Sequence, residues 1–263
     1  MTFSFGLNWQ LFLQNCNDER IRIARSSLIE FLGIENLRGK SFLDIGCGSG
    51  LFSYGAFQLG AERIVSIDID PFSVQCCQHM HEKAHHPSHW QISQGSVLDK
   101  PFISQFKDFD IIYSWGVLHH TGRMWEAIQN AAELVKPGGV FYIAIYNKVE
   151  GPIGSEFWLR IKKIYNFGPK FLRPVLEFLY TAALVSREIV MRRNPVKYVK
   201  NYQQDRGMSL DTDVKDWLGG YPYEFATSQE IIDFMKKHFP AYVLTNTKTC
   251  ASIGNNWFLF KRP

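Results

Sequence analysis

The chain has 263 residues, 46% hydrophobic and 21% charged, with a formal net charge of +4, which fits one large globular domain with room for an inserted subdomain. Five cysteines without a Cys-x-x-Cys pair, and a start without signal-peptide character, argue against a disulfide framework and favour a cytoplasmic protein. The longest apolar stretch, residues 171–191, is interrupted by charged residues, so it is not expected to cross a bilayer.

In chain order, the first predicted element is a helix over residues 17–32, which Asn17 or Asp18 caps and Gly33 ends. Strands and helices then alternate up to residue 146, and a helix at 228–238 precedes a closing pair of strands. The expected strands are 41–45, 63–67, 90–93, 110–115, 140–146, 242–249 and 256–261, and the helices between them are 51–59, one from Pro71 with Asp70 as its cap, and one from Thr121 to Lys136. Because each parallel pairing needs a crossover, this alternation predicts a doubly wound, mostly parallel seven-stranded α/β sheet.

The rest of the chain is organised around this core, residues 17–147 and 228–263. Residues 148–227 are expected to form a helical insert after the fifth strand that caps the substrate site. Residues 1–16 are unusually aromatic for a chain end, so they are expected to pack on the domain. The sequence leaves open whether they also fold over a cofactor, with Trp9 as its cover.

A glycine-rich turn follows the first strand, at Asp44-Ile-Gly46-Cys47-Gly48-Ser-Gly50. In an open parallel sheet, ligands bind beyond the carboxyl ends of the strands, and glycines let the backbone approach them closely. The helix that follows offers unpaired N–H groups to an anion such as a carboxylate. Position 51 is Leu and not the glycine of a dinucleotide fingerprint, which argues against a nicotinamide cofactor. Asp68 follows Gly46 by about 20 residues, the spacing at which a carboxylate binds a ribose diol.

Five segments, taken in order, resemble the motifs of class I S-adenosylmethionine-dependent methyltransferases, and the resemblance covers about residues 35–147. They are Phe42–Gly50, Ile64–Asp68, Gly95–Asp99, Phe109–Ser114 and Leu134–Gly139. Small-molecule methylases similar to those of ubiquinone synthesis are the nearest relatives in style. The resemblance implies a Rossmann-like fold with S-adenosylmethionine as the cofactor.

The resemblance also implies which residues contact that cofactor. Asp44 and the backbone at Gly46 and Gly48 would hold its amino-acid end, and Asp68 its ribose hydroxyls. Its adenine would lie among Ile69, Ser96 and Val97. Ser96 stands where many relatives have Asp, and Asp99 is an alternative for that contact. The expected cofactor set further includes Cys47, Gly50, Ser114 and Trp9.

His119 and His120 follow the fourth strand, on the cofactor side of the expected sheet. Methyl transfer from a sulfonium to a hydroxyl needs close positioning, a site closed to water, and a base whose pKa lies near the working pH. Histidine suits that task, so we predict His120 as the base and His119 as its helper, with capping of the next helix as the alternative for one of them. The residues expected at the methyl acceptor are Trp115, Tyr146, Asn147, Tyr221, Tyr223 and Glu224. The histidine-rich segment 76–89 lacks zinc-type spacing, so no metal is expected.

Residues 160–200 carry ten Lys or Arg residues against only Glu177 and Glu188, interleaved with aromatic residues. Three interpretations stay open: a helical cap with its basic face in water, contact with an anionic membrane surface, and binding of an anionic ligand. Nucleic acid is not expected as a partner, because no binding module is appended and the net charge is modest. The sequence leaves the oligomeric state open.

Together these observations favour an O-methyltransferase that acts on a small or lipid-like acceptor. The alternatives are N- or C-methylation of a sugar, amine or isoprenoid, and methylation of tRNA or rRNA. A sensor or partner subunit that binds S-adenosylmethionine without catalysis is a further alternative. The sequence identifies neither the acceptor nor the atom that is methylated.

Overall fold

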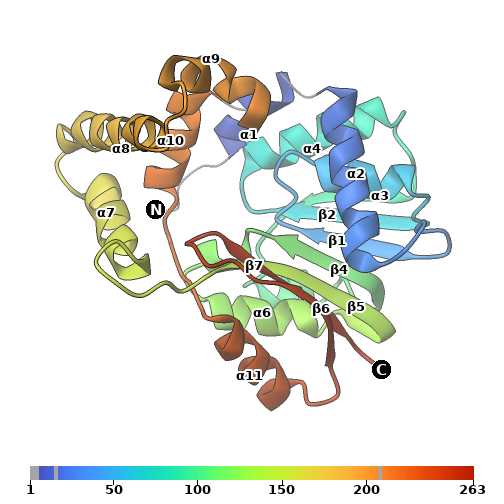
Figure 1. The fold of residues 1–263 in the computed structure, drawn as a ribbon. Coiled ribbons are helices and arrows are strands. Elements are labelled where there is room, and N and C mark those ends of the chain that lie inside the picture. The colour runs from blue at the N-terminus through green and yellow to red at the C-terminus, as the bar shows by residue number, and fades with distance from the viewer. Residues whose placement is uncertain (1–5, 15–16, 207–208) are drawn as a thin grey trace.

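The protein contains one seven-stranded sheet in the order β3-β2-β1-β4-β5-β7-β6 (Figure 1). A computed structural model describes residues 6–14, 17–206 and 209–263, so positions 1–5 and 15–16 of the expected N-terminal segment lie outside the described residues. The strands are β1 (Ser41–Ile45), β2 (Arg63–Asp68), β3 (Trp90–Gln94), β4 (Phe109–Trp115), β5 (Val135–Tyr146), β6 (Val243–Lys248) and β7 (Asn255–Lys261). β1 to β5 pair in parallel, and β7 runs antiparallel to β5 and β6. The predicted doubly wound, mostly parallel fold is confirmed.

Helices cover both faces of this sheet (Figure 1). On one face lie α2 (Asp18–Leu32), α3 (Leu51–Gln58) and α4 (Pro71–Lys83), and on the other α5 (Lys100–Ile103), α6 (Met124–Ala132) and α11 (Ser228–His238). Successive side chains of a strand point to opposite faces, so Phe42 of β1 packs in the first core and Leu43 in the second. The helices on each face of the sheet thus pack their apolar side chains against alternate residues of the strands.

Local signals fix the starts of two helices on the first face. Asn17 accepts a hydrogen bond from the N–H of Arg20 (3.1 Å) and caps α2. Asp70 accepts from the N–H of Phe72 (2.9 Å) and caps α4 ahead of Pro71. Both predicted caps are confirmed.

The prediction that Thr121 caps the next helix is wrong. Thr121 follows a short 3-10 turn, η1 (Leu118–His120), and its hydroxyl donates to the carbonyl of Leu118. α6 begins at Met124, whose N–H donates to both carboxylate oxygens of Glu224, at 3.0 and 3.2 Å. The acid comes from a distant part of the chain, so no local pattern indicates it.

The segment after β5 forms the expected helical insert, α7 (Ser155–Phe167), α8 (Leu172–Val190), α9 (Pro195–Arg206) and α10 (Leu210–Gly219). Tyr165, Val214 and Leu218 form a small core of their own within it. Among the helices of the described residues, none is long and apolar enough to cross a membrane.

A short helix at the start of the chain, α1 (Gly6–Gln14), links the core to the insert. The N–H of Gly6 donates to Asp70 at the start of α4 (3.0 Å), and the amide of Asn8 donates to Asp216 on α10 (2.6 Å). The described part of the N-terminal segment, α1, therefore packs on the domain.

Candidate active site

The predicted glycine turn lies at the point where the strand order reverses. β1 is flanked by β2 and β4, so the connections that leave β1 and β4 run to opposite sides of the sheet. In open α/β sheets such a switch point opens a crevice at the carboxyl ends of the strands. The hydroxyl of Ser114, near the end of β4, donates to the carbonyl of Ile45 at the end of β1 (2.9 Å) and fixes the two strand ends together.

Neither Gly46 nor Gly48 has room for a side chain. Gly46 and Gly48 have φ angles of 78° and 52°, a region that favours glycine. A Cβ at Gly46 would overlap Val117, which follows β4, at 2.4 Å. A Cβ at Gly48 would lie 2.9 Å from Nε1 of Trp9 on α1. The turn is therefore bare backbone between the end of β4 and the indole of Trp9.

Two carboxylates lie at this turn, one part-buried and one buried. Asp68, at the end of β2, accepts from the N–H groups of Gly48 (3.0 Å) and Asp70 (2.9 Å), and burial raises its pKa to about 6. Asp44, only 2% exposed, accepts from the hydroxyl of Ser53 (2.6 Å) beneath the turn, and burial raises its pKa to about 7. Asp68 is thus at the edge of the turn and Asp44 under it.

The residues expected at the adenine line the ends of β2 and β3. Ile69 is 60% exposed, and Val97 is buried. The hydroxyl of Ser96 accepts from the N–H of Leu98 (3.1 Å), while Asp99 caps α5 by accepting from Phe102 (3.2 Å). Both polar side chains therefore also stabilise their own turn.

Cys47 faces the core beneath the turn. A hydrogen bond with the thiol of Cys77 on α4, together with burial, raises the pKa of Cys47 well above its usual value. Only its backbone is thus part of the bare turn.

The two histidines after β4 have different partners. His120 places Nδ1 2.6 Å from the carbonyl oxygen of Pro222. His119, fully buried, accepts through Nδ1 from the N–H of Tyr146 (3.2 Å). Because a carbonyl only accepts and an N–H only donates, His120 carries its proton on Nδ1 and His119 on Nε2 when both are neutral. Burial lowers the pKa of both, that of His120 to about 3.

Comparison with known proteins identifies the domain. Residues 43–141 match the model of a protein family described as a methyltransferase domain. The ubiquinone biosynthesis O-methyltransferase of Pelagibacter ubique (strain HTCC1062) is 28% identical over 173 residues, 62% of this chain and 69% of that protein. The protein of the same name from Glaesserella parasuis serovar 5 (strain SH0165) is 32% identical over 52% of this chain and 61% of its own length. The match places a methyltransferase domain at residues 43–141 of the chain.

A solved structure agrees with this fold. Magnesium protoporphyrin IX methyltransferase from Synechocystis PCC 6803, with bound SAH, superposes with a TM-score of 0.53 at 15% identity, covering 94% of this chain and 89% of that one. The family match extends from β1 into β5, so the glycine turn, Asp68 and both histidines lie in the methyltransferase domain, and the insert lies outside the matched residues.

The residues at the turn fit S-adenosylmethionine, the cofactor that the sequence motifs imply. Gly46 and Gly48 present backbone without side chains, and α3 has no side-chain cap on its first N–H groups. Asp68 offers carboxylate oxygens at the end of the neighbouring strand, where hydroxyl groups of a sugar need an acceptor.

Beside the histidines, the insert contributes a buried lysine that the sequence analysis did not single out. Lys162 of α7 is 1% exposed, and its ammonium lies 4.1 Å from the ring centroid of Trp217 and 4.9 Å from that of Tyr223. The ammonium also donates to the carbonyl of Trp217. Tyr146 joins this group, with its ring 4.0 Å from that of His119. Burial lowers the pKa of Lys162 to about 7.

A sequence signal for this lysine exists. Trp158, Lys162 and Tyr165 recur at the spacing of one helix face, and Trp158 and Tyr165 pack in the insert core. A lysine among aromatic residues on an inward face indicates a buried cation. Lys162 is also one of ten basic residues between positions 160 and 200, and the total charge of that segment does not distinguish a buried lysine from an exposed one.

The structure brings only some of the predicted acceptor residues to this group. Tyr146 and Tyr223 belong to it, with ring centroids 5.2 Å apart. Asn147 instead ties β5 to the β6–β7 hairpin, donating to the carbonyl of Cys250 (2.7 Å). The side chains of the others have different partners: Trp115 packs on Trp257, Tyr221 on Phe167, and Glu224 caps α6, although the N–H of Glu224 donates to the carbonyl of His119 (2.9 Å).

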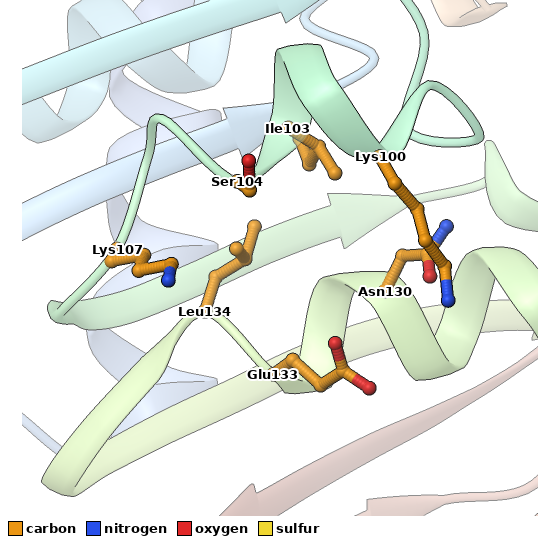
Figure 2. Close-up of a pocket in the computed structure, with 7 residues that line it drawn as sticks. All are labelled: Lys100, Ile103, Ser104, Lys107, Asn130, Glu133 and Leu134. Carbon is orange, nitrogen blue, oxygen red and sulfur yellow. The ribbon is translucent and has the colours of Figure 1, made fainter.

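A surface hollow is lined by other residues than this site (Figure 2). It lies between α5 and α6, and it contains none of the predicted site residues. Its lining is Lys100, Ile103, Ser104, Lys107, Asn130, Glu133 and Leu134.

Proposed function

We propose that the protein transfers the methyl group of S-adenosylmethionine to a hydroxyl oxygen of a small or lipid-like molecule, with His120 as the base. The hydrogen bond from Nδ1 of His120 to the carbonyl of Pro222 carries the proposal, because it leaves Nε2 without a proton. The two curated relatives named above support a hydroxyl acceptor, since both are described as O-methyltransferases.

The cofactor is held at the carboxyl ends of β1, β2 and β3. Asp68 accepts from the ribose hydroxyls, and the backbone at Gly46 and Gly48 binds the amino-acid end above Asp44. Ile69, Ser96 and Val97 surround the adenine. When bound, S-adenosylmethionine supplies a methyl carbon activated by a positively charged sulfur.

His120 and His119 have separate tasks in this proposal. His120 takes the proton of the acceptor hydroxyl through Nε2, the nitrogen that carries no proton in the tautomer set by Pro222. Its pKa of about 3, lowered by burial, is below the near-neutral value at which a base is most effective. His119 presents an N–H through Nε2, a buried atom without a hydrogen-bond partner in the described structure. A buried donor without a partner is costly, so the hydroxyl oxygen of an acceptor is a fitting partner for it.

The aromatic group beside the histidines orients the acceptor. Tyr146, Trp217 and Tyr223 offer ring faces to a flat or apolar molecule, and Lys162 among them offers a positive charge. As the hydroxyl loses its proton, this buried charge stabilises the oxygen anion that forms, because charges interact strongly away from water. The insert thereby closes the site to solvent.

The function is tested by incubating the purified protein with methyl-labelled S-adenosylmethionine and extracts fractionated into small-molecule, lipid, RNA and protein pools. We expect label in the small-molecule or lipid pool, and a product whose new methyl carbon is bonded to oxygen by mass spectrometry and NMR. Label in RNA or protein alone, or a methyl on nitrogen or carbon, would contradict the proposal. Tight cofactor binding with no labelled product in any pool would instead support the alternative of a sensor or partner subunit that binds S-adenosylmethionine without catalysis.

Trp9 is proposed to cover the bound cofactor, because its indole lies against Gly48 of the turn. Replacing Trp9 by Ala should therefore weaken binding of S-adenosylmethionine by about tenfold, through loss of ring contact and of exclusion of water. Calorimetric titration measures the affinity. Trp125→Ala, which removes a part-exposed ring on α6, is the matched control and should leave the affinity unchanged. Equal affinities for the two variants would show that Trp9 only packs on the domain.

A further inference from the structure

Helix α8, at the outside of the insert and away from the sheet, is apolar on two opposite faces (Figure 1). Its inner face carries Leu176, Tyr180 and Leu184, which pack on the small core of the insert. Its outer face and its first turn carry large apolar side chains that are exposed, namely Phe171 (71%), Val175 (48%), Phe178 (71%), Leu179 (56%), Ile189 (59%) and Val190 (81%). Helical spacing places these side chains on one stripe, turned away from the inner face.

The outer stripe is unusual for a helix in water. Of the large apolar side chains on α8, only those of the inner face pack on the core of the insert. Contiguous exposed apolar side chains of this kind mark a surface that binds something else. The two phenylalanines at the N-terminal half contribute the largest rings of the stripe.

The charges around the stripe are of one sign. Lys170 precedes the helix, and Arg192 and Arg193 follow it, all of them exposed. The two acids of α8 are directed elsewhere: Glu177 accepts from the hydroxyl of Tyr165 (2.6 Å), and Glu188 is buried, 3.8 Å from Arg193. The face that α8 presents to solvent is therefore apolar with basic ends.

We propose that this outer face of α8 docks the protein on an anionic lipid surface. An amphipathic helix of this kind lies in the plane of the interface, with its aromatic and aliphatic side chains at the boundary of headgroups and acyl chains. The basic residues at both ends then meet lipid phosphates. A second copy of the chain fits the face less well, because like charges would meet and the described residues of α8 present no exposed acid to pair with them. The docking is independent of which molecule is methylated.

Sedimentation with vesicles tests the docking, using the full chain without cofactor or acceptor. The protein should sediment with vesicles of phosphatidylcholine and phosphatidylglycerol, and at least about tenfold less with phosphatidylcholine alone. The double variant Phe171→Ser/Phe178→Ser should bind the mixed vesicles at least about tenfold more weakly. Lys170→Gln/Arg192→Gln should lose affinity by about as much, through charge alone.

Ile23→Ser is the matched control, since Ile23 is 60% exposed on α2, a helix of the core that lies away from α8 (Figure 1). This variant should bind vesicles like the unaltered chain, and circular dichroism should show all variants folded. No binding to the mixed vesicles, or equal binding by the phenylalanine variant, overturns the proposal. A second result would also overturn it: light scattering shows that the unaltered chain is a dimer, and Phe171→Ser/Phe178→Ser dissociates the dimer without changing vesicle binding. The stripe would then bind a second copy of the chain. None of these results depends on methyl transfer, so the proposed function stands or fails separately.

Discussion

Replacing Asp68 by Asn is expected to weaken binding of S-adenosylmethionine by about 100-fold, the loss of charge-assisted hydrogen bonds to two ribose hydroxyls. Asn has the same shape and keeps one oxygen acceptor. The amide nitrogen of Asn cannot accept, so the variant removes the charge and also one of the two hydrogen bonds that Asp68 accepts from the N–H groups of Gly48 and Asp70. Calorimetric titration with the cofactor and with its demethylated product measures the effect. Asp18→Asn, an exposed carboxylate at the start of α2, is the control and should bind both ligands normally.

The pH dependence of binding tests the same carboxylate. Burial raises the pKa of Asp68 to about 6, and the ionised form is the one that accepts from the ribose. Affinity should be full above that pH and fall by about tenfold between pH 7 and pH 5, as the free protein takes up a proton that binding must release. Asp44, with its pKa raised to about 7, titrates in the same range, so the difference between the unaltered chain and Asp68→Asn isolates Asp68. If the affinity does not change with pH, or if the substitution leaves it unaltered, Asp68 does not bind the ribose hydroxyls.

The sequence predicted the sheet well because its signals are local. β1 is a short apolar run that ends in glycines, and its bounds, Ser41–Ile45, agree with the prediction. β5 begins earlier than predicted, at Val135, because the Lys-Pro-Gly-Gly segment continues the strand. The pairing of Phe109 with Val135 shifts in register before Ile111, an irregularity that absorbs those residues. The turn residues alone therefore predicted too late a start for β5, because pairing with β4 extends the strand back to Val135.

The acceptor side was predicted less well because long-range contacts build it. Glu224 looked available for an acceptor, yet it caps α6 across a separation of 100 residues. Lys162 looked like one of many surface cations, yet the fold places it between Trp217 and Tyr223. Burial decides the chemistry of both side chains, and burial depends on the packing of the insert, which helical periodicity does not specify.

Replacing His120 by Asn is expected to lower kcat by about 100-fold to 10,000-fold, the usual contribution of a positioned base, with cofactor affinity within about twofold of normal. The amide of Asn can donate to the carbonyl of Pro222 as Nδ1 of His120 does, so the local fold is kept. The ring nitrogen that would take the acceptor proton is absent. The rate is measured with the acceptor identified by labelling, and the affinity by calorimetry.

Two further variants distinguish a base from a merely structural histidine. His79→Asn changes an exposed histidine of α4 and should leave both rate and affinity normal. His119→Gln keeps an N–H near the position of Nε2 but loses the acceptor for Tyr146, so a donor role predicts a loss of about tenfold, smaller than that at His120. A greater loss at His119 than at His120 would reverse the two roles, because the tautomers argued from Pro222 and Tyr146 would then not be those of the reacting protein. Near-normal turnover in His120→Asn would show that the acceptor loses its proton without a side-chain base, and that the histidine pair only holds β5 and the returning segment together.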